Sequence, residues 1–388
     1  MHHILQFMNI GFDAKRAFHN VTGLGNYSRT LIDSLSSFFP DNTYYLFNPK
    51  RSSCYSSLSK HIVEINPSGI FPTLFPSLWR SRWMVNDIEK KVNLYHGLSN
   101  ELPFGIHRSK VKKVVTIHDL IFEHYPAQYN KNDVLIYRKK FKYACEHADI
   151  IIAISESTKK DLVNLYSIQP EKIEVCYQSC DQRFFTSANE SQRKMAQDRY
   201  GLTTPYFLSV GSIIERKNLL RICMAFNEMQ KETPCNLVVI GKGNGIYKEE
   251  ILNYINNEQL YGKIIFLEDN FRSDDIQKDM PILYQNATAL VYPSEMEGFG
   301  IPVLEAMASS TPVITSDRSS LPEAGGDAAQ CIDPLDPVAM HLAMKRLLSD
   351  DDFRKESIQK GLRHSQKFNN EHTAQKVMSI YKQLNSKI

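Results

Sequence analysis

Short apolar runs alternate with amphipathic stretches along the second half of the chain. The runs are apolar on both faces, as expected for parallel strands covered by helices, and they span Tyr206–Val210, Asn236–Ile240, Ile264–Leu267, Ala287–Tyr292 and Pro312–Thr315. Helical spacing fills the intervals at Leu219–Glu232, Tyr247–Asn256, Asp274–Tyr284 and Ile301–Ala308. This order predicts an α/β fold with a doubly wound parallel sheet.

The first part of the chain follows the same alternation less regularly. We expect strands at Ile4–Phe12, Thr43–Phe47, Val92–Tyr95, Val114–Ile117, Ile150–Ile154 and Ile173–Cys176. We expect helices over Gly25–Phe39, Asp133–His147 and Glu156–Tyr166. The polar stretch Asp181–Gln197 is interpreted as the link between two Rossmann-like halves, and the serine-rich Ser52–Ser59 as a loop. The charged tail Pro337–Ser386 predicts two or three helices.

The length of the chain favours two domains. Its 388 residues exceed the roughly 250–300 at which a single hydrophobic core stops growing. We predict two Rossmann-like domains over residues 1–185 and 186–370, facing each other across a cleft. A final helix over residues 371–388 is expected to pack back on the first domain.

Composition excludes several classes of protein. Hydrophobic residues make up 42% and charged residues 23%, which are ordinary globular values. The net charge of +3 is too small to indicate nucleic acid as the main partner. We expect a cytoplasmic protein, because Met1–Leu5 does not resemble a signal peptide, no apolar run has the length of a membrane span, and the seven cysteines fit reduced thiols.

The most informative motif is Glu297-Gly-Phe-Gly-Ile-Pro-Val-Leu-Glu305, which follows a predicted strand. Its glycines permit a tight turn and close approach of the backbone to a ligand, and Pro302 suits the first turn of a helix. The free N–H groups of that helix start favour a phosphate. Glu305 can accept hydrogen bonds from ribose hydroxyls, and Glu297 can face a sugar. The alternative, a helix entry with two solvated acids, does not explain the whole pattern.

A second motif, Gly211-Ser-Ile-Ile-Glu-Arg-Lys-Asn218, also joins a predicted strand to a helix. Arg216 can bind a diphosphate through two hydrogen bonds, and Lys217 adds a point charge. Taken alone, the pair fits a solvated basic surface equally well. Its place in the same half as the glutamate motif favours a phosphate site. Because these cations and a helix N-terminus can supply the charge of a metal, we expect no metal ion.

The first half offers only single candidates. Thr22-Gly-Leu-Gly-Asn-Tyr27 follows the first strand, and a plain β–α turn is as good an interpretation as an anion loop. His118 and Asp119 follow another strand, where a histidine can contact a sugar hydroxyl or make local hydrogen bonds. His96 is either a core histidine or a cleft residue. Tyr125 belongs with them as a weak acceptor-side candidate.

Taken together, these residues resemble glycosyltransferase family 4, which has the GT-B fold. The resemblance covers nearly the whole chain, and its motifs are Gly23–Tyr27, Thr116–Leu120, Ser155–Thr158, Gly211–Asn218, Glu297–Ala308, Pro312–Ile314 and Ser319–Glu323. It implies an N-terminal acceptor-binding domain, a C-terminal nucleotide-sugar-binding domain and transfer with retention of anomeric configuration. The favoured mechanism is front-face attack, in which the leaving phosphate takes the acceptor proton.

The resemblance also implies the roles of individual residues. Arg216 and Lys217 would bind the donor diphosphate, Glu305 the ribose and Glu297 the transferred sugar, while His118 would contact the donor sugar. The catalytic set is then His118, Arg216, Lys217 and Glu297. The donor-binding set is Gly25, Gly211, Arg216, Lys217, Glu297, Gly298, Phe299, Gly300, Ile301 and Glu305, and the acceptor-binding set is His96, Asp119 and Tyr125.

We therefore expect a hexosyltransferase of polysaccharide biosynthesis that acts on a glycan or lipid-linked acceptor. The pattern is most similar to the mannosyltransferase branch, which favours GDP-mannose as the donor. A GT-B-fold nucleotide-sugar epimerase and a non-catalytic nucleotide-sugar-binding subunit are the alternatives. Trp79, Arg80, Arg82 and Trp83 follow an apolar stretch and suggest peripheral contact with the inner face of a membrane, the alternative being a helix pair packed inside the N-terminal domain.

Overall fold

The computed structural model describes residues 7–52, 55–56 and 59–386. Its internal contacts divide the chain into two compact units. Unit 1 is Met1–Ser179 together with Asn370–Ile388, and unit 2 is Cys180–Asn369. The predicted domain limits lay instead after residues 185 and 370.

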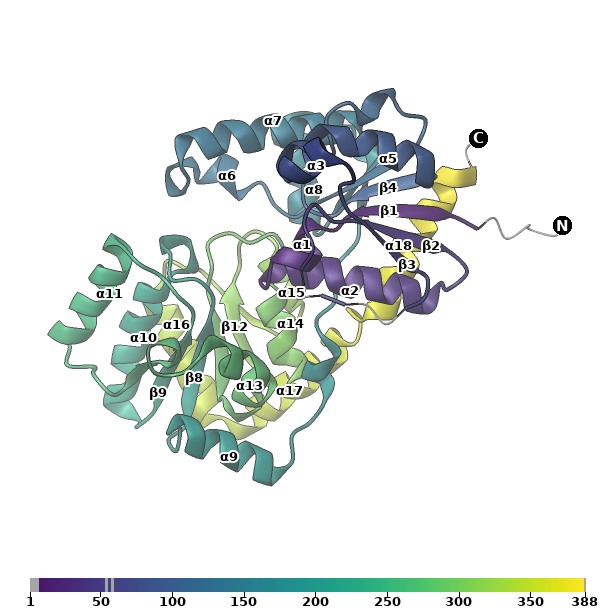
Figure 1. The fold of residues 1–388 in the computed structure, drawn as a ribbon. Coiled ribbons are helices and arrows are strands. Elements are labelled where there is room, and N and C mark those ends of the chain that lie inside the picture. Colours follow the sequence, from purple (N-terminus) through teal and green to yellow (C-terminus); the bar gives the residue numbers. More distant parts are fainter. Residues whose placement is uncertain (1–6, 53–54, 57–58, 387–388) are drawn as a thin grey trace. The chain divides into compact units, whose positions relative to one another are not determined.

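Unit 1 contains a parallel sheet of seven strands in the order β3-β2-β1-β4-β5-β6-β7 (Figure 1). The strands are β1 (Asn9–Asp13), β2 (Thr43–Phe47), β3 (Ile62–Ile65), β4 (Leu94–Gly97), β5 (Lys112–Ile117), β6 (Ile150–Ala153) and β7 (Ile173–Val175). The main helices are α1 (Lys15–His19), α2 (Gly23–Phe38), α5 (Met84–Lys91), α6 (Ile121–His124), α7 (Lys131–His147), α8 (Glu156–Tyr166) and α18 (Asn370–Ser386). Shorter ones are α3 (Ile70–Leu74), α4 (Pro76–Leu78), the π-helix η1 (Trp79–Trp83), η2 (Ile106–Arg108), η3 (Pro126–Gln128) and η4 (Pro170–Lys172).

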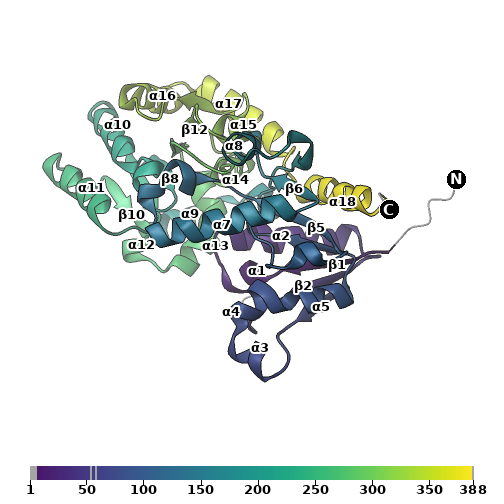
Figure 2. The same cartoon turned by 90° about the horizontal axis from the view of Figure 1, so that it is seen from above.

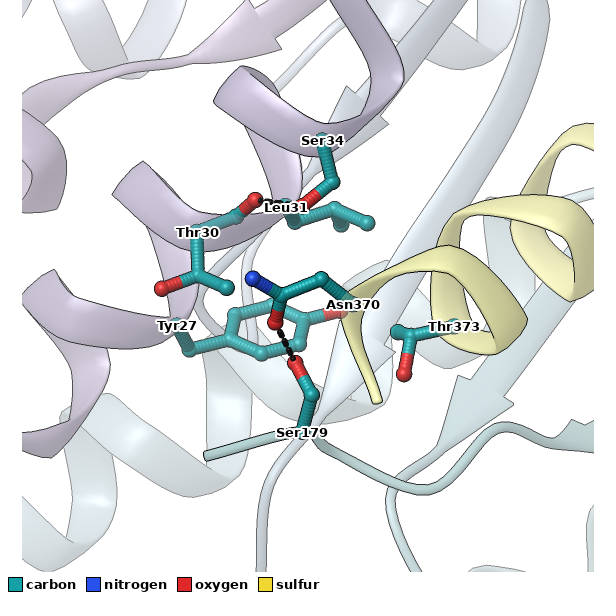
Figure 3. A pocket seen from close by; sticks show the side chains of 7 residues that line it. All are labelled: Tyr27, Thr30, Leu31, Ser34, Ser179, Asn370 and Thr373. Carbon is teal, nitrogen blue, oxygen red and sulfur yellow. Dashed lines mark hydrogen bonds between the residues drawn. The ribbon is translucent and has the colours of Figure 1, made fainter. Parts of the chain in front are cut away.

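The last helix, α18, packs on α2 of unit 1 (Figure 1). Its buried side chains, among them Val377 and Tyr381, join one core cluster with residues of β1, β2 and α2. A narrow crevice lies between α2 and the start of α18, where the Ser179 hydroxyl donates a hydrogen bond of 2.6 Å to Asn370 Oδ1 (Figure 3). The end of the chain is therefore an integral part of its first folding unit.

Unit 2 contains a parallel sheet of six strands in the order β10-β9-β8-β11-β12-β13. The strands are β8 (Tyr206–Val210), β9 (Asn236–Ile240), β10 (Ile264–Phe266), β11 (Ala289–Tyr292), β12 (Val313–Ser316) and β13 (Gln330–Ile332). The helices are η5 (Gln182–Phe185), α9 (Glu190–Tyr200), η6 (Glu215–Lys217), α10 (Leu219–Glu232), α11 (Ile246–Asn257), α12 (Leu267–Asn270), α13 (Ser273–Asn286), α14 (Ile301–Ala308), α15 (Leu321–Gly325), α16 (Pro337–Ser349) and α17 (Asp351–Ser365).

The predicted α/β class with two doubly wound parallel sheets is confirmed. The interpretation of Asp181–Gln197 as a link is wrong, because η5 and most of α9 lie there and belong to unit 2. Parts of two further predictions, residues 4–6 of the first strand and 53–54 and 57–58 of the serine-rich loop, lie outside the described residues. No helix within the described ranges is both long and apolar enough to cross a membrane.

Candidate active site

The carboxyl edge of the unit 2 sheet brings the two strongest motifs together. Strands β8 and β11 are neighbours, so the segments that follow them leave the sheet side by side. The first is Gly211–Asn218 and the second is Glu297–Glu305. In open parallel sheets this edge is where ligands bind.

Arg216, Lys217 and Glu297 form a single buried ion cluster. Lys217 Nζ is paired with Glu297 Oε1 and donates a hydrogen bond of 2.5 Å to the Tyr292 hydroxyl. Arg216 Nη1 lies 3.2 Å from the same carboxylate oxygen and also donates to the Met296 carbonyl. The Lys217 ammonium lies 4.7 Å from the centre of the Tyr292 ring, and the face of that ring stabilises the positive charge further. Two cations therefore share one carboxylate, and the cluster carries net positive charge.

The electrostatics of this cluster suit an anionic ligand. Burial would raise the pKa of Glu297, but Lys217 and Arg216 outweigh it and hold that pKa below its ordinary value. Arg216 Nε is buried and has no hydrogen-bond partner among the described residues. A buried donor without a partner is costly, so this atom points to an acceptor that a ligand would supply. No group of three or more His, Cys, Asp or Glu side chains in the described part of the chain is arranged to hold a metal ion.

The turn before α14 requires glycine at position 300. Gly300 has φ +119°, which side chains rarely adopt, and a Cβ there would lie 2.8 Å from Leu321 Cδ2. Ser320 Oγ lies 2.9 Å from the carbonyl oxygens of both Glu297 and Phe299, and its single O–H, shared between these two acceptors, fixes the turn. Helix α14 then starts at Ile301 without a side-chain cap. Pro302 has no N–H and the Val303 N–H donates to the Gly300 carbonyl, so the first turn offers a phosphate the Ile301 N–H and the positive end of the helix dipole.

Glu305 lies one turn into α14, separate from the ion cluster. Burial raises its pKa to about 7, and the Tyr284 hydroxyl, which donates a hydrogen bond of 3.1 Å to Oε2, only partly offsets this. A half-buried carboxyl group whose desolvation is offset by only one hydrogen bond is typical of a functional site.

His118 lies in unit 1, just after β5, and its ring is fixed on both sides. Nε2–H donates a hydrogen bond of 2.8 Å to the Leu98 carbonyl, so Nδ1 accepts the 3.0 Å hydrogen bond from Gln178 Nε2. The Tyr27 ring stands edge-on at 4.7 Å. Burial lowers the pKa of His118 to about 4, which keeps the ring neutral at physiological pH.

His96 lies wholly inside unit 1. The ring is 0% exposed, Nδ1 shares a hydrogen bond of 2.6 Å with the Tyr381 hydroxyl, and Nε2 shares one of 2.8 Å with Thr116 Oγ1. This is the arrangement of a core histidine, and the side chain presents no surface to a ligand.

Of the other predicted residues of unit 1, Gly25 lies in the first turn of α2, Asp119 in the turn after β5, and Tyr125 at the end of α6. The Gly25 N–H donates to Asn20 Oδ1 at 3.2 Å, and a Cβ at this position would lie 1.8 Å from the Asn20 carbonyl oxygen. The Asp119 carboxylate accepts a hydrogen bond of 3.1 Å from the Ile121 N–H at the start of α6. Tyr125 is half-buried at the end of that helix.

A buried charge network at the carboxyl end of β1 was not predicted from the sequence. Arg80 is paired with both Asp13 and Glu101, and Lys140 Nζ lies 2.8 Å from Glu101. The position of Asp13 directly after an apolar strand is the signal that could have identified it. Arg80 belongs to this network and is buried, so it does not contact a lipid surface.

Other supporting residues were missed in unit 2. Tyr292 and Tyr284 orient Lys217 and Glu305, although both appeared only as apolar members of predicted elements. Their hydroxyl groups are the signal, because a buried tyrosine normally finds a polar partner.

Two doubly wound units, one with two cations and a helix N-terminus at the carboxyl edge of its sheet, are typical of nucleotide-binding α/β proteins. Within that class, residues 21–183 match the family model described as Glycosyltransferase Family 4, and residues 190–364 match Glycosyl transferases group 1. The chain belongs to this family. It is a glycosyltransferase of the retaining family 4 with the GT-B fold, and it uses a nucleotide-sugar donor.

Among similar proteins, O-antigen chain mannosyltransferase B of Escherichia coli is 28% identical over 306 residues, covering 79% of this chain and 77% of that one. O-antigen chain mannosyltransferase RfbU of Salmonella typhimurium is 29% identical over 236 residues, or 61% and 60% of the two chains. The crystal structure of Anabaena Alr3699/HepE in complex with UDP and glucose superposes with a TM-score of 0.73 at 15% identity, covering 97% of this chain and 99% of that chain.

Proposed function

We propose that this enzyme transfers mannose from GDP-mannose to a glycan or lipid-linked oligosaccharide in polysaccharide biosynthesis. The observation that carries the donor site is the buried cluster of Arg216, Lys217 and Glu297 at the carboxyl edge of the unit 2 sheet. The choice of mannose is supported by the two relatives, which are both O-antigen chain mannosyltransferases.

The cluster suggests how the leaving group is stabilised. Arg216 and Lys217 would bind the diphosphate, whose charge grows as the bond to the sugar breaks. Preorganised donors that face developing charge are the largest single source of rate enhancement in many enzymes. The N-terminus of α14 would add to this field, and Glu297, displaced from Lys217 by the phosphates, would face the transferred sugar.

Retention in this proposal needs no carboxylate nucleophile. The acceptor hydroxyl would attack from the face that the phosphate leaves, and the departing phosphate oxygen would take its proton. Glu305 would accept hydrogen bonds from the ribose hydroxyls, and the backbone from Gly298 to Ile301 would lie against the donor.

Unit 1 would supply the acceptor side. His118 would contact the donor sugar as a neutral imidazole, Gly25 would lie near the diphosphate, and Asp119 and Tyr125 would contribute to the acceptor site. His96 is proposed only to support this surface from within, because its ring is internal. The enzyme would work in the cytoplasm, consistent with free thiols at all cysteines that the structure describes.

The test is transfer by the purified chain with a panel of nucleotide sugars and a lipid-linked glycan acceptor. GDP-mannose should give transfer or slow donor hydrolysis above the other donors. Arg216→Ala should lower kcat by about 100- to 1000-fold, as removal of one charge-stabilising donor does. Arg272→Ala, which removes an exposed arginine of the same unit, is the matched control and should leave the rate unchanged.

Full activity of Arg216→Ala would refute the role of the cluster. A preference for another donor would refute GDP-mannose while leaving the family assignment intact. If NMR shows that the donor alone is converted to an epimer, the nucleotide-sugar epimerase is favoured instead.

A further inference from the structure

A polar cavity lies at the amino edge of the unit 2 sheet. Its volume is about 650 Å³, which is within the range of roughly 300–1,000 Å³ that small-molecule sites occupy. Its lining includes the residues that precede three neighbouring strands, namely Pro205 before β8, Thr288 before β11 and Pro312 before β12. The ion cluster of the candidate active site follows the opposite ends of β8 and β11. Because β8 spans five residues, the two edges are roughly 15 Å apart, and the cavity is a separate site.

Two arginines from different helices line this cavity. Arg193 belongs to α9 and Arg354 to α17, and Figure 2 shows α17 on one side of unit 2 and α9 on the other. Arg354 Nη2 donates a hydrogen bond of 2.7 Å to Asp351 Oδ1, whereas Arg193 forms no ion pair among the described residues. None of the residues that line the cavity is acidic. The cavity therefore favours an anionic ligand.

The wall beside Arg193 is held in place by hydrogen bonds. Arg193 Nε donates to the Ala188 carbonyl at 3.2 Å, and Arg193 Nη2 donates to Gln285 Oε1 at 3.4 Å. Asn286 Nδ2 in turn donates to the Arg193 carbonyl at 3.1 Å. These contacts join α9 to the end of α13, so the guanidinium is positioned before a ligand arrives and binding requires little ordering of the chain.

The other polar groups of the lining suit a ligand that is rich in hydroxyl groups. Five of its hydroxyl and amide side chains form no hydrogen bond within the described part of the chain, and they are Gln197, Thr203, Thr204, Thr288 and Ser310. Hydroxyl and amide groups both donate and accept, so they can pair with the hydroxyls of a sugar. Flat apolar surface is supplied beside them by Pro205 and Pro312. Such a mixture of a few polar groups with apolar surface is typical of small-molecule sites.

Ser310 occupies an unusual backbone conformation at this cavity. It lies between α14 and β12 with φ +62°, in the left-handed region that glycine adopts more easily than serine. Strained residues other than glycine are found preferentially at ligand sites. Here the strained residue places a serine side chain in the lining, where glycine would leave only backbone.

We propose that this cavity binds a phosphorylated sugar. The phosphate lies between Arg193 and Arg354, because its tetrahedral oxygens can accept hydrogen bonds from two sides, whereas a planar carboxylate is best matched by one guanidinium. The sugar hydroxyls pair with the side chains of Gln197, Thr288 and Ser310. The inference goes beyond the proposed function, because this site is at the opposite edge of the sheet and does not depend on the donor or the acceptor.

The test is calorimetric titration of the full chain with mannose 6-phosphate, with mannose and with inorganic phosphate. Wild type should bind mannose 6-phosphate more tightly than either of the other two. Arg193→Gln/Arg354→Gln should weaken this binding by at least about 10-fold, as the loss of charge-assisted hydrogen bonds does. The matched control is Lys194→Gln/Arg363→Gln, which removes two exposed cations of the same helices outside the lining and should bind like wild type. Arg216→Ala should also keep this binding.

Ser310→Gly separates binding from folding. Glycine relieves the positive φ, so the Tm should not fall, but the variant loses a hydroxyl group of the lining. The affinity for mannose 6-phosphate should therefore fall by about 2- to 10-fold, the contribution of one neutral hydrogen bond. Unchanged affinity in this variant would contradict the part assigned to Ser310.

Three results overturn the proposal. The first is a wild type that does not bind mannose 6-phosphate. The second is binding that persists in Arg193→Gln/Arg354→Gln but is lost in Arg216→Ala, since the ligand would then occupy the candidate active site. The third is inorganic phosphate that binds as tightly as mannose 6-phosphate, since the hydroxyl and amide groups would then contribute nothing. Donor hydrolysis measured without any sugar phosphate reports on the proposed function separately.

Discussion

Glu305 is a half-buried carboxylic acid whose pKa is raised close to neutral pH. Its raised pKa of about 7 reflects burial that a single hydrogen bond from Tyr284 does not offset. Accepting two ribose hydroxyls favours the carboxylate, so donor binding should lower this pKa.

The donor affinity should therefore depend on pH through Glu305. Above pH 7 the free enzyme already holds the carboxylate and binds the nucleotide at full strength. Below pH 7 a proton must leave first, so the affinity should fall by up to about 10-fold for each pH unit. Calorimetric titration with an intact nucleotide sugar, whose diphosphate has no group that titrates between pH 5.5 and 8.5, measures this, and the dependence should disappear in Glu305→Gln.

The same variant has a stability consequence that serves as a control. An acid with a raised pKa destabilises the fold once pH exceeds its ordinary value near 4.5, and the cost is complete above pH 7. Glu305→Gln should therefore unfold at higher denaturant concentration than wild type at pH 8, by up to about 3 kcal/mol, and with no gain at pH 4. A variant that is less stable at pH 8 would show that the carboxylate has compensating partners.

His118 should show no titration where Glu305 does. With a pKa of about 4 the ring stays neutral, and its proton stays on Nε2 because the Leu98 carbonyl accepts from it. Ring ¹⁵N shifts should report this one tautomer from pH 5.5 to 8. Gln178→Leu removes the donor to Nδ1 and should lower kcat by about 10-fold, the lower end of the effect of a misplaced catalytic group. A protonated ring near pH 6 would contradict the buried position of His118.

Among the helices and strands, those with a clear hydrophobic pattern in their own sequence could be predicted. Strands such as β8 and β11 are apolar on both faces, so their sequences identify them without knowledge of the fold. Helix α9 was missed because Ala196 and Tyr200 are its only buried residues, which leaves little hydrophobic period to detect. Strand β3 was missed for a similar reason, since none of its residues is fully buried.

The turn into α14 should tolerate no side chain at position 300. Gly300→Ala forces a Cβ toward Leu321 at a φ that alanine avoids, so the turn should shift and the donor affinity fall by 10-fold or more. The matched control is Gly262→Ala, where φ is +76° but no atom lies within 4 Å of the added Cβ. Gly262→Ala has the backbone strain of a positive φ, about 1 kcal/mol, but no steric clash of its Cβ. It should therefore bind the donor normally. Equal donor affinity in both variants would contradict the importance of the turn.

At the scale of the whole molecule, the candidate site was predictable in unit 2 and much less so in unit 1. The unit 2 residues follow neighbouring strands, and parallel strands bring such segments together by geometry alone. In unit 1, the partner of His96 is Tyr381, 285 positions away, and the partner of Asp13 is Arg80. No local pattern connects residues so distant, so the internal place of His96 could not be read from the sequence.

Removing α18 should destabilise unit 1 and spare unit 2. Both tryptophans, Trp79 and Trp83, belong to unit 1, so their fluorescence follows that unit during urea unfolding. Tyr381→Phe leaves His96 Nδ1 without its partner and should cost about 1–3 kcal/mol in the fluorescence transition. A chain that stops at Asn369 should lose this transition while keeping the circular dichroism of unit 2. An unchanged fluorescence transition in both variants would refute the contribution of α18.

The place of α18 also has a consequence for synthesis on the ribosome. The first 179 residues emerge long before the helix that completes their core, because the whole of unit 2 is translated in between. At about 5–20 residues per second, this delay is on the order of 10 s or more. During that time the α2 surface that later receives Val377 and Tyr381 is uncovered, so the nascent first unit should be a target for chaperones that bind apolar segments. Unit 2, although made later, is the first to have all its residues available for folding.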